Sequence, residues 1–169
     1  YTKTDKTYLY YKFNNIYFKV PTFGYLFKII DFGRSIFTFQ NKVFFNDTFN
    51  RHGEAEGQYT YPNRHLLYMN DNKELITPNF NFDLCRLAIT ILDELVLEDS
   101  DESSEFINFI KSLTKDKNGG FLYELEDDFN MYIEIAKSAC NSRPCDIITN
   151  DIFKKFRIKK KHFPKRNFY

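Results

Sequence analysis

Short runs of apolar and aromatic residues, separated by polar pairs, mark the first part of the chain. Residues 8–13 and 16–20 are rich in Tyr, Phe, Ile and Val, and the pair Asn14-Asn15 stands between them. Aromatic and β-branched residues on both sides of a two-residue Asn turn predict a β-hairpin.

Two further stretches have the same character. Residues 25–30 predict a third strand, which would deliver Asp31 to its end. Residues 35–45 again favour β-structure, with a turn at Gln40-Asn41. The first 45 residues are therefore expected to form β-hairpins.

Residues 46–81 have a different composition, dominated by Asn, Asp, Gly, Pro, Arg and His. Gly53, Gly57, Pro62 and Pro78 punctuate the stretch. It is too long for a passive connection in a compact domain, so we expect it to be either functional or mobile.

Helical periodicity follows. In residues 83–97 apolar side chains leave almost no polar stripe, so we expect a helix that is buried nearly all round at the centre of the domain. Ser103 or Ser104 is a candidate N-cap for the next helix. The apolar residues with helical spacing in that next helix are Phe106, Ile107, Phe109, Ile110 and Leu113.

Two more helices are expected before the C-terminus. One runs from about 127 to 140, and a short one lies near 150–156, with Pro144 ending the region between them. The inward residues of the longer helix are expected to be Phe129, Tyr132, Ile133, Ala136 and Ala139. Since strands precede helices, we expect an α+β fold with segregated halves, in which β-hairpins are followed by a mainly helical bundle around a buried central helix.

Composition narrows the class of protein. The chain has 169 residues, 43% of them hydrophobic and 19% aromatic, which suits one domain with a sizeable core rather than wholesale disorder. No apolar run approaches a membrane span, and no N-terminal segment reads as a signal peptide. The odd number of cysteines, Cys85, Cys140 and Cys145, predicts free thiols in a reducing, intracellular compartment and disfavours a zinc site.

The formal net charge of +1 conceals two blocks of opposite sign. Residues 93–128 hold twelve acidic residues against three lysines, and residues 137–169 hold ten Lys and Arg against two Asp. In the basic tail, 154–166, eight Lys and Arg alternate with Phe156 and Phe163. That mixture suits nucleic-acid binding, but a helix end followed by a solvated terminus explains it as well, and we favour the latter.

The most informative stretch is Tyr25–Ser35, which reads Tyr-Leu-Phe-Lys-Ile-Ile-Asp-Phe-Gly-Arg-Ser. An apolar strand leads to Asp31, Phe32 can pack beneath the carboxylate, and Gly33 lets the chain change direction freely. A carboxylate fixed at a strand end beside a hinge suits a site that holds a divalent metal ion against a phosphate.

In this strand context the triplet Asp31-Phe32-Gly33 resembles the metal-binding motif of protein kinases, in which the Asp holds Mg²⁺ that bridges nucleotide phosphates. Residues 81–88, Asn-Phe-Asp-Leu-Cys-Arg-Leu-Ala, resemble the start of the buried central helix of the kinase C-lobe. An Asp there anchors the catalytic loop through hydrogen bonds to its backbone, and Asp83 matches that position.

The resemblance covers nearly the whole chain, and these features are similar to those of kinase-like proteins of large DNA viruses. It implies a partial protein-kinase-like domain over 1–169, of the C-lobe type. Hairpins with the Asp-Phe-Gly motif would occupy 1–45, an activation-segment-like region 46–81, and a helical subdomain with the basic tail 82–169. It also implies ATP and Mg²⁺ as cofactors, Asp31 as the metal ligand, and a protein substrate.

The sequence departs from the kinase pattern in several respects. It has no Gly-rich phosphate loop, no strand Lys with a helix Glu partner, no His-Arg-Asp-like catalytic loop and no Ala-Pro-Glu. Asn14 and Asn15 do not supply the loop's metal-binding Asn, because Leu9 and Tyr10 stand where that loop needs an Asp. Arg34 after the triplet is also unusual for the family.

We therefore expect a fragment of a protein kinase that transfers the γ-phosphoryl group of ATP to a Ser, Thr or Tyr hydroxyl of a protein, with its N-lobe and catalytic loop ahead of Tyr1. The chain alone is then expected to be inactive. Two alternatives stay open: a catalytically dead kinase fold that acts as an interaction or virion scaffold, and a nucleic-acid binder that uses the basic tail. A small-molecule kinase of the same fold would require a different segment after the triplet.

Overall fold

The fold is α+β, with small antiparallel sheets. The computed structural model describes residues 1–45, 47–49, 53–55, 58, 78–97, 104–125 and 128–164. The chain divides into two compact units, which we call the terminal unit (Tyr1–Asp31 with Thr149–Tyr169) and the middle unit (Phe32–Ile148). In the described part of the chain, no helix combines the length and the apolar character that a membrane crossing needs.

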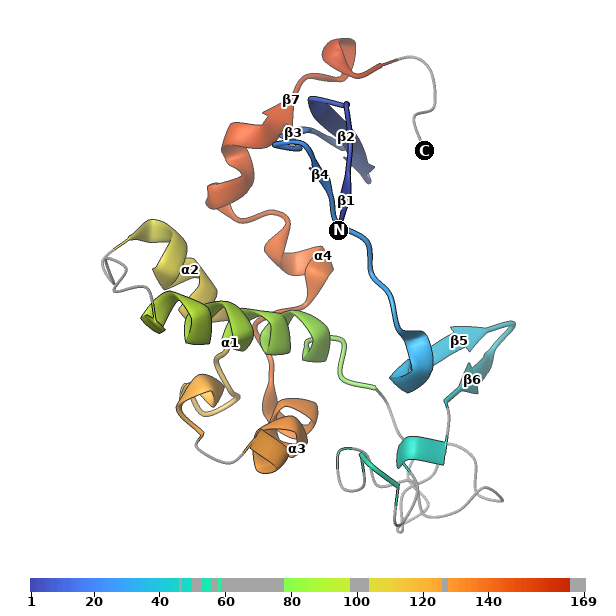
Figure 1. Ribbon diagram of the computed structural model, residues 1–169, viewed down its shortest axis with the longest axis vertical. Helices are drawn as coiled ribbons and strands as arrows, with labels where there is room; N and C mark the ends of the chain where they lie inside the picture. The colour runs from blue at the N-terminus through green and yellow to red at the C-terminus, as the bar shows by residue number, and fades with distance from the viewer. Residues whose placement is uncertain are drawn as a thin grey trace. The chain divides into compact units, whose positions relative to one another are not determined.

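The terminal unit is built on the expected β-hairpin (Figure 1). Strands β2 (Tyr8–Phe13) and β3 (Ile16–Pro21) pair antiparallel around Asn14, whose φ of 52° is the left-handed conformation that Asn tolerates. A shorter ladder joins β1 (Thr2–Lys3) to β4 (Tyr25–Leu26). The hairpin prediction is thus confirmed.

The strand expected over 25–30 is shorter than predicted. Pairing ends after Leu26, because β1 offers only two residues as a partner. The side chains of Phe27, Ile29 and Ile30 are 85%, 85% and 78% exposed. The chain therefore reaches Asp31 as an extended apolar segment rather than as a paired strand.

Within its described residues, the basic tail returns to the first hairpin. After a 3₁₀ segment at Asp151–Phe156, β7 (Arg157–Ile158) pairs with β3 and completes a three-stranded sheet in the order β2-β3-β7. The Phe163 ring then packs edge-on against Tyr17 and Tyr10, at centroid distances of 5.0 and 6.1 Å. The expectation that strands and helices occupy separate halves of the sequence is wrong here, because β7 returns to the first hairpin.

The middle unit begins with a second hairpin, β5 (Phe37–Phe39) and β6 (Lys42–Phe44). Gln40 and Asn41 both have positive φ (48° and 60°), as a two-residue hairpin turn of type I′ requires, which confirms the predicted turn. Next to this hairpin, Phe49 and Ala55 are buried together against Ile36 and Phe45.

Helices form the rest of the middle unit. They are α1 (Phe82–Leu97), α2 (Glu105–Leu113), the 3₁₀ turn Leu122–Glu124, α3 (Asp128–Ser138) and α4 (Pro144–Ile147). Ser104, one of the two predicted N-cap residues, caps α2. Its hydroxyl accepts a hydrogen bond from the Ile107 N–H at 3.1 Å. Pro144 begins α4 rather than ending a region, in the first-turn position where its missing N–H costs nothing.

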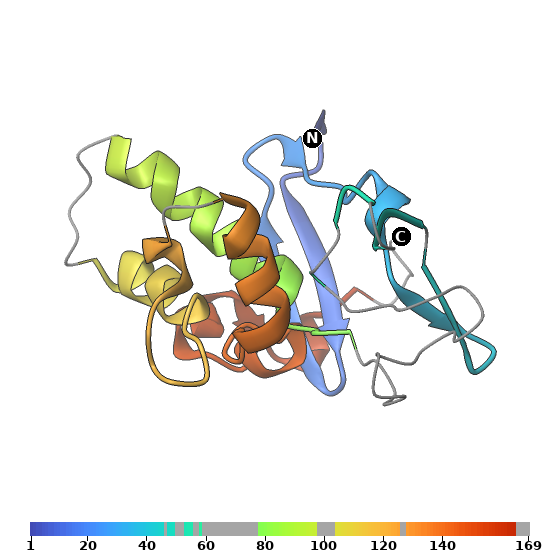
Figure 2. The same cartoon turned by 90° about the horizontal axis from the view of Figure 1, so that it is seen from below.

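Helix α1 divides the core into two clusters (Figures 1 and 2). Cys85 and Ile89 pack with α3 and the Leu122–Glu124 turn, whereas Ala88 and Leu92 pack with α2. The prediction that α1 is buried all round is wrong, because Leu87 is 52% exposed on the side that the described neighbours leave uncovered.

The inward face of α3 also differs from the prediction. Met131 and Ile135, which the prediction left out, are buried, whereas Ile133 is only partly buried. Ala136 and Ala139 are buried as expected, and Tyr132 packs at the margin of the cluster. The predicted contact of Phe129 lies outside the described side chains. A helix with apolar residues on two adjacent stripes leaves the choice of face to its neighbours.

Two asparagines join the start of α1 to the end of α3. The Asn79 side-chain amide donates to the carbonyl oxygens of Ile135, Ala136 and Ala139, at 3.1, 3.2 and 2.9 Å. Its Oδ1 accepts from the backbone N–H and the side-chain amide of Asn81, at 3.0 and 2.9 Å.

Ser142 completes this junction, and its side chain is fully buried. Its N–H donates to Asn81 Oδ1 at 2.9 Å and its hydroxyl to the Asn81 carbonyl oxygen at 2.7 Å. Asn79 thus satisfies carbonyl groups at the end of α3 that would otherwise lack donors, and Asn81 and Ser142 connect this end to the start of α1. We call Asn79, Asn81 and Ser142 the helix junction.

Replacing Asn79 should destabilise the protein. Asn79→Ala removes the donor to three carbonyl oxygens at the end of α3, so we expect a loss of about 2–3 kcal/mol in the free energy of unfolding by urea denaturation. Asn79→Asp should cost at least as much, because a carboxylate would face those oxygens. The control, Asn118→Ala in an exposed turn, should change stability by less than about 0.5 kcal/mol. Equal effects at the two sites would contradict the role of the junction.

The Cys85 thiol should be inert in the folded protein. Burial, together with the nearby Cys140, raises the pKa of Cys85 from 9.0 to about 12. In the native state at pH 8 we expect a disulfide-exchange reagent to react with Cys140 and Cys145 only, and with Cys85 after denaturation. Three thiols of equal reactivity in the native protein would contradict the prediction.

The same shift has a consequence for stability. Because the folded protein holds the Cys85 thiol proton more tightly than the unfolded chain does, the raised pKa stabilises the folded state below pH 9. This contribution to the free energy of unfolding is lost as the pH rises from 9 towards 12. The difference in melting temperature between the natural protein and Cys85→Ala should therefore narrow between pH 8 and pH 10.5. A difference that stays constant or widens would show that the thiol stays accessible to ionisation.

Candidate metal-binding site

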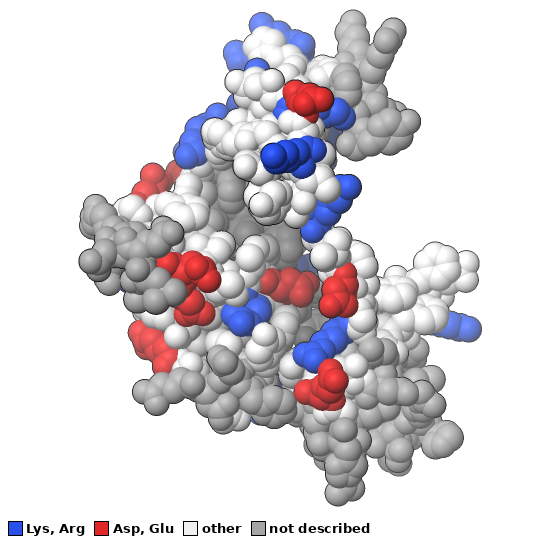
Figure 3. Space-filling view, in the orientation of Figure 1, with Lys and Arg blue, Asp and Glu red and all other residues white. Residues whose placement is uncertain are grey.

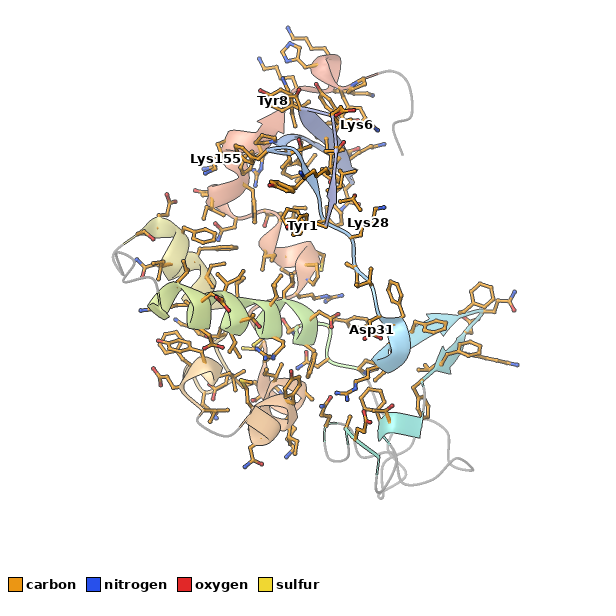
Figure 4. The ribbon with its side chains drawn as sticks, in the orientation of Figure 1. Tyr1, Lys6, Tyr8, Lys28, Asp31 and Lys155 are labelled. Carbon is orange, nitrogen blue, oxygen red and sulfur yellow. The ribbon has the colours of Figure 1, made fainter. Side chains whose placement is uncertain are left out.

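Asp31 stands at the boundary between the two compact units, since the terminal unit ends with it and the middle unit begins at Phe32. Its φ is 61°, a left-handed conformation that few residues other than Gly, Asn and Asp adopt readily. A 3₁₀ turn over Phe32–Arg34 follows at once, closed by a hydrogen bond from the Ser35 N–H to the Phe32 carbonyl oxygen at 3.0 Å. Figure 4 shows Asp31 at the start of this turn.

The surroundings of the triplet differ in one respect from the expectation. Phe32 does not pack beneath the carboxylate, because its side chain is 68% exposed. Asp31 and Gly33 are exposed as well. Because only the short β1–β4 ladder precedes the triplet, the described residues form no sheet against which the Phe32 ring could pack.

The donor set around Asp31 fits only part of an Mg²⁺ site. In the described residues, no group of three or more His, Cys, Asp or Glu side chains is placed to hold a metal ion. Mg²⁺ is commonly bound by one or two carboxylates, with phosphate and water oxygens completing its octahedral shell. A single exposed carboxylate therefore suits a shared metal and phosphate site, but not a metal cage formed by protein alone.

Arg34, the last residue of the 3₁₀ turn, forms an ion pair. Its guanidinium lies 2.7 Å from the carboxylate of Glu54, with both side chains largely exposed. Sequence reasoning singled out Arg34 as unusual but did not find this partner, because twenty residues separate the two and no local pattern connects them. An exposed pair of this kind orients the segments more than it stabilises the fold.

The second predicted site residue, Asp83, lies in the exposed first turn of α1. Its carboxylate favours helix formation there through the helix dipole. Among the described residues no hydrogen bond or ion pair of Asp83 is found, and the start of α1 is held by Asn79 and Asn81 instead. Its role as an anchor for a catalytic loop stays a prediction.

Asp31 and Asp83 belong to different compact units, the terminal unit and the middle unit respectively. Chemically, the triplet can present one carboxylate in a fixed backbone conformation next to a turn.

A scan of protein-family models and searches of curated proteins and of solved structures found no match to this chain.

Proposed function

We propose that the chain is part of a protein kinase that transfers the γ-phosphoryl group of ATP to a Ser, Thr or Tyr hydroxyl of a protein, and that Asp31 holds the Mg²⁺ that accompanies ATP. The observation that carries the proposal is the left-handed backbone of Asp31 between the β1–β4 ladder and the 3₁₀ turn, in an Asp-Phe-Gly sequence. Asp is one of the few residues that adopt this conformation readily, and the fixed backbone sets the direction of the carboxylate.

Bound Mg²⁺ would neutralise phosphate charge during phosphoryl transfer. In this proposal, the role of the chain is to position one ligand of the Mg²⁺, the Asp31 carboxylate. The ladder sets the path of the chain up to Leu26, and the φ of Asp31 together with the turn sets the direction of its carboxylate. The residues that bind the ATP phosphates and accept the substrate proton would come from other parts of the kinase.

The antiparallel register supports this arrangement. Thr2 pairs with Leu26 and Lys3 with Tyr25, so a segment that prolongs β1 towards the N-terminus would run opposite Phe27–Asp31. Such a segment would cover the exposed Phe27, Ile29 and Ile30 and approach Asp31 from the other side.

The same exposed side chains favour a second candidate function. Four large apolar side chains, those of Phe27, Ile29, Ile30 and Phe32, are each at least 68% exposed within six residues. Clusters of this kind are typical of protein interfaces. A catalytically inactive kinase fold that serves as a scaffold would use this segment as a contact and would not require a metal at Asp31.

Metal binding by Asp31 can be tested on the chain as it is. Substoichiometric Mn²⁺ should broaden the amide NMR signals of residues around Asp31, with millimolar affinity because one carboxylate binds weakly. Asp31→Asn should abolish the effect, and Asn keeps the left-handed backbone that Ala would disturb. Asp5→Asn, an exposed carboxylate in the same unit, is the control and should leave it unchanged. Broadening that is centred elsewhere would exclude the site.

A phosphate-transfer assay distinguishes the kinase proposal from the scaffold alternative. The chain alone should show no transfer of phosphate from ATP to casein. In the longer protein that the proposal requires, Asp31→Asn should lower the rate at least about 100-fold, since a metal ligand supports several kcal/mol of charge stabilisation. A rate within threefold of the natural protein would contradict the kinase proposal, and no transfer by either version would favour the scaffold.

A further inference from the structure

The terminal unit is strongly basic. Its described residues include eleven Lys and Arg against three Asp, a net charge of +8. On the face of the molecule in Figure 3, Lys and Arg outnumber acidic side chains over this unit. The sequence placed these cations in two separate regions, whereas the pairing of β7 with β3 collects the hairpin and the tail in one sheet.

One face of this sheet combines tyrosines with lysines. Side chains alternate between the faces of a strand, so the register places Pro21 and Ile158 on one face together with five tyrosines and lysines: Tyr8, Tyr10, Lys12, Tyr17 and Lys19. The opposite face carries Phe18, which is 4% exposed, and Tyr11, which is 52% exposed. We call the five residues the tyrosine–lysine face.

Cations and rings are neighbours on this face. The ammonium group of Lys19 lies 3.9 Å from the centre of the Tyr8 ring, and that of Lys12 lies 6.0 Å from the centre of the Tyr17 ring. Tyr8, at the start of β2, is 42% exposed. The face thus presents aromatic surface with positive charge beside it, and none of the three Asp of the unit belongs to it.

The tail adds charge at the border of the same face. Phe163 packs on Tyr10 and Tyr17, both members of the tyrosine–lysine face. The 3₁₀ turn Lys160–His162 directly precedes Phe163 in the chain, and Lys159, Lys160 and Lys161 are exposed. The contact of Phe163 therefore keeps three further cations next to the tyrosines.

We propose that the tyrosine–lysine face, with Lys159–Lys161 at its border, binds single-stranded nucleic acid. Lysines neutralise backbone phosphates, and exposed rings stack with unpaired bases of any sequence. Tyr8 is the exposed ring of this face, whereas Tyr10 and Tyr17 are half-buried against Phe163, so Tyr8 is the ring available for stacking. The proposal does not depend on the kinase proposal, because it uses neither Asp31 nor a metal ion.

A lipid surface fits the same residues less well. Interfacial binding needs a continuous apolar face that enters the acyl boundary, alongside the cations. On the tyrosine–lysine face the rings carry hydroxyl groups and alternate with lysines, so no such apolar surface is present among these five residues. A duplex would hide its bases from the rings.

Fluorescence anisotropy of a labelled 15-nucleotide oligo-dT strand with the intact chain tests the proposal. Binding should weaken with salt, with a slope of log affinity on log salt of about −2 to −4, which corresponds to about three to six phosphate contacts at −0.7 each. The double change Lys12→Gln and Lys19→Gln should lower affinity about tenfold and make the slope shallower by about 1.4. The control, Lys115→Gln and Lys137→Gln, removes two exposed charges from the middle unit and should change affinity less than twofold.

Stacking has its own test. Tyr8→Ala should lower affinity at least fivefold, whereas Tyr8→Phe keeps the ring and should stay within twofold. Circular dichroism on each variant checks that the sheet is intact, and the lysine variants, with exposed or half-buried side chains, test the face independently if Tyr8→Ala unfolds.

Four outcomes would overturn the proposal. These are absence of binding at 50 mM salt, equal losses in the lysine variant and its control, tighter binding of a duplex of the same length, and full affinity in a folded Tyr8→Ala. Vesicles with about 30% phosphatidylserine provide a further comparison. Vesicle binding that excess oligo-dT does not displace would assign the face to membranes, whereas displacement by the oligonucleotide supports the proposal.

Discussion

The helical part of the chain depends on the helix junction of Asn79, Asn81 and Ser142. A helix end exposes backbone groups that lack partners, and burying such an end is costly unless side chains supply the missing hydrogen bonds. Asn79 provides donors for the end of α3, while the Asn81 carbonyl oxygen accepts the first helical bond of α1, from the Cys85 N–H at 3.1 Å. One junction therefore sets both the start of α1 and the end of α3, and with them the positions of Cys85 and Ile135 in the core.

Features that depend on a few neighbouring residues could be predicted from the sequence. The Asn14 hairpin, the Gln40-Asn41 turn, the Ser104 cap and helix α1 each follow from local propensity or periodicity. The pairing of β7 with β3 could not be predicted, because Arg157 and Phe18 are far apart in the sequence and two residues form too short a strand signal. The face that α3 buries was unpredictable for a related reason, since its partners on α1 choose between two apolar stripes.

In the candidate site, too, local features could be predicted from the sequence and long-range contacts could not. The position of Asp31 after an apolar run and before Gly33 is visible in the sequence, but its left-handed backbone is not. The exposure of Phe32 was missed because packing beneath a carboxylate requires a layer that sequence patterns do not report. Glu54 was missed as the partner of Arg34, since a surface ion pair between distant residues leaves no periodic trace.

Both proposed sites of the terminal unit concern phosphate, but they require opposite electrostatics. Asp31 is anionic and repels a phosphate unless a divalent cation lies between the two, so its binding would depend on the metal. The tyrosine–lysine face attracts phosphate directly, and its binding would depend on salt through the release of counterions. The described residues of this unit have a net charge of +8, and Asp31 is one of its three Asp. Magnesium dependence would distinguish a ligand held at Asp31 from one held by Lys12 and Lys19. The two sites can therefore fail or succeed separately, because chelation of metal removes one interaction and added salt removes the other.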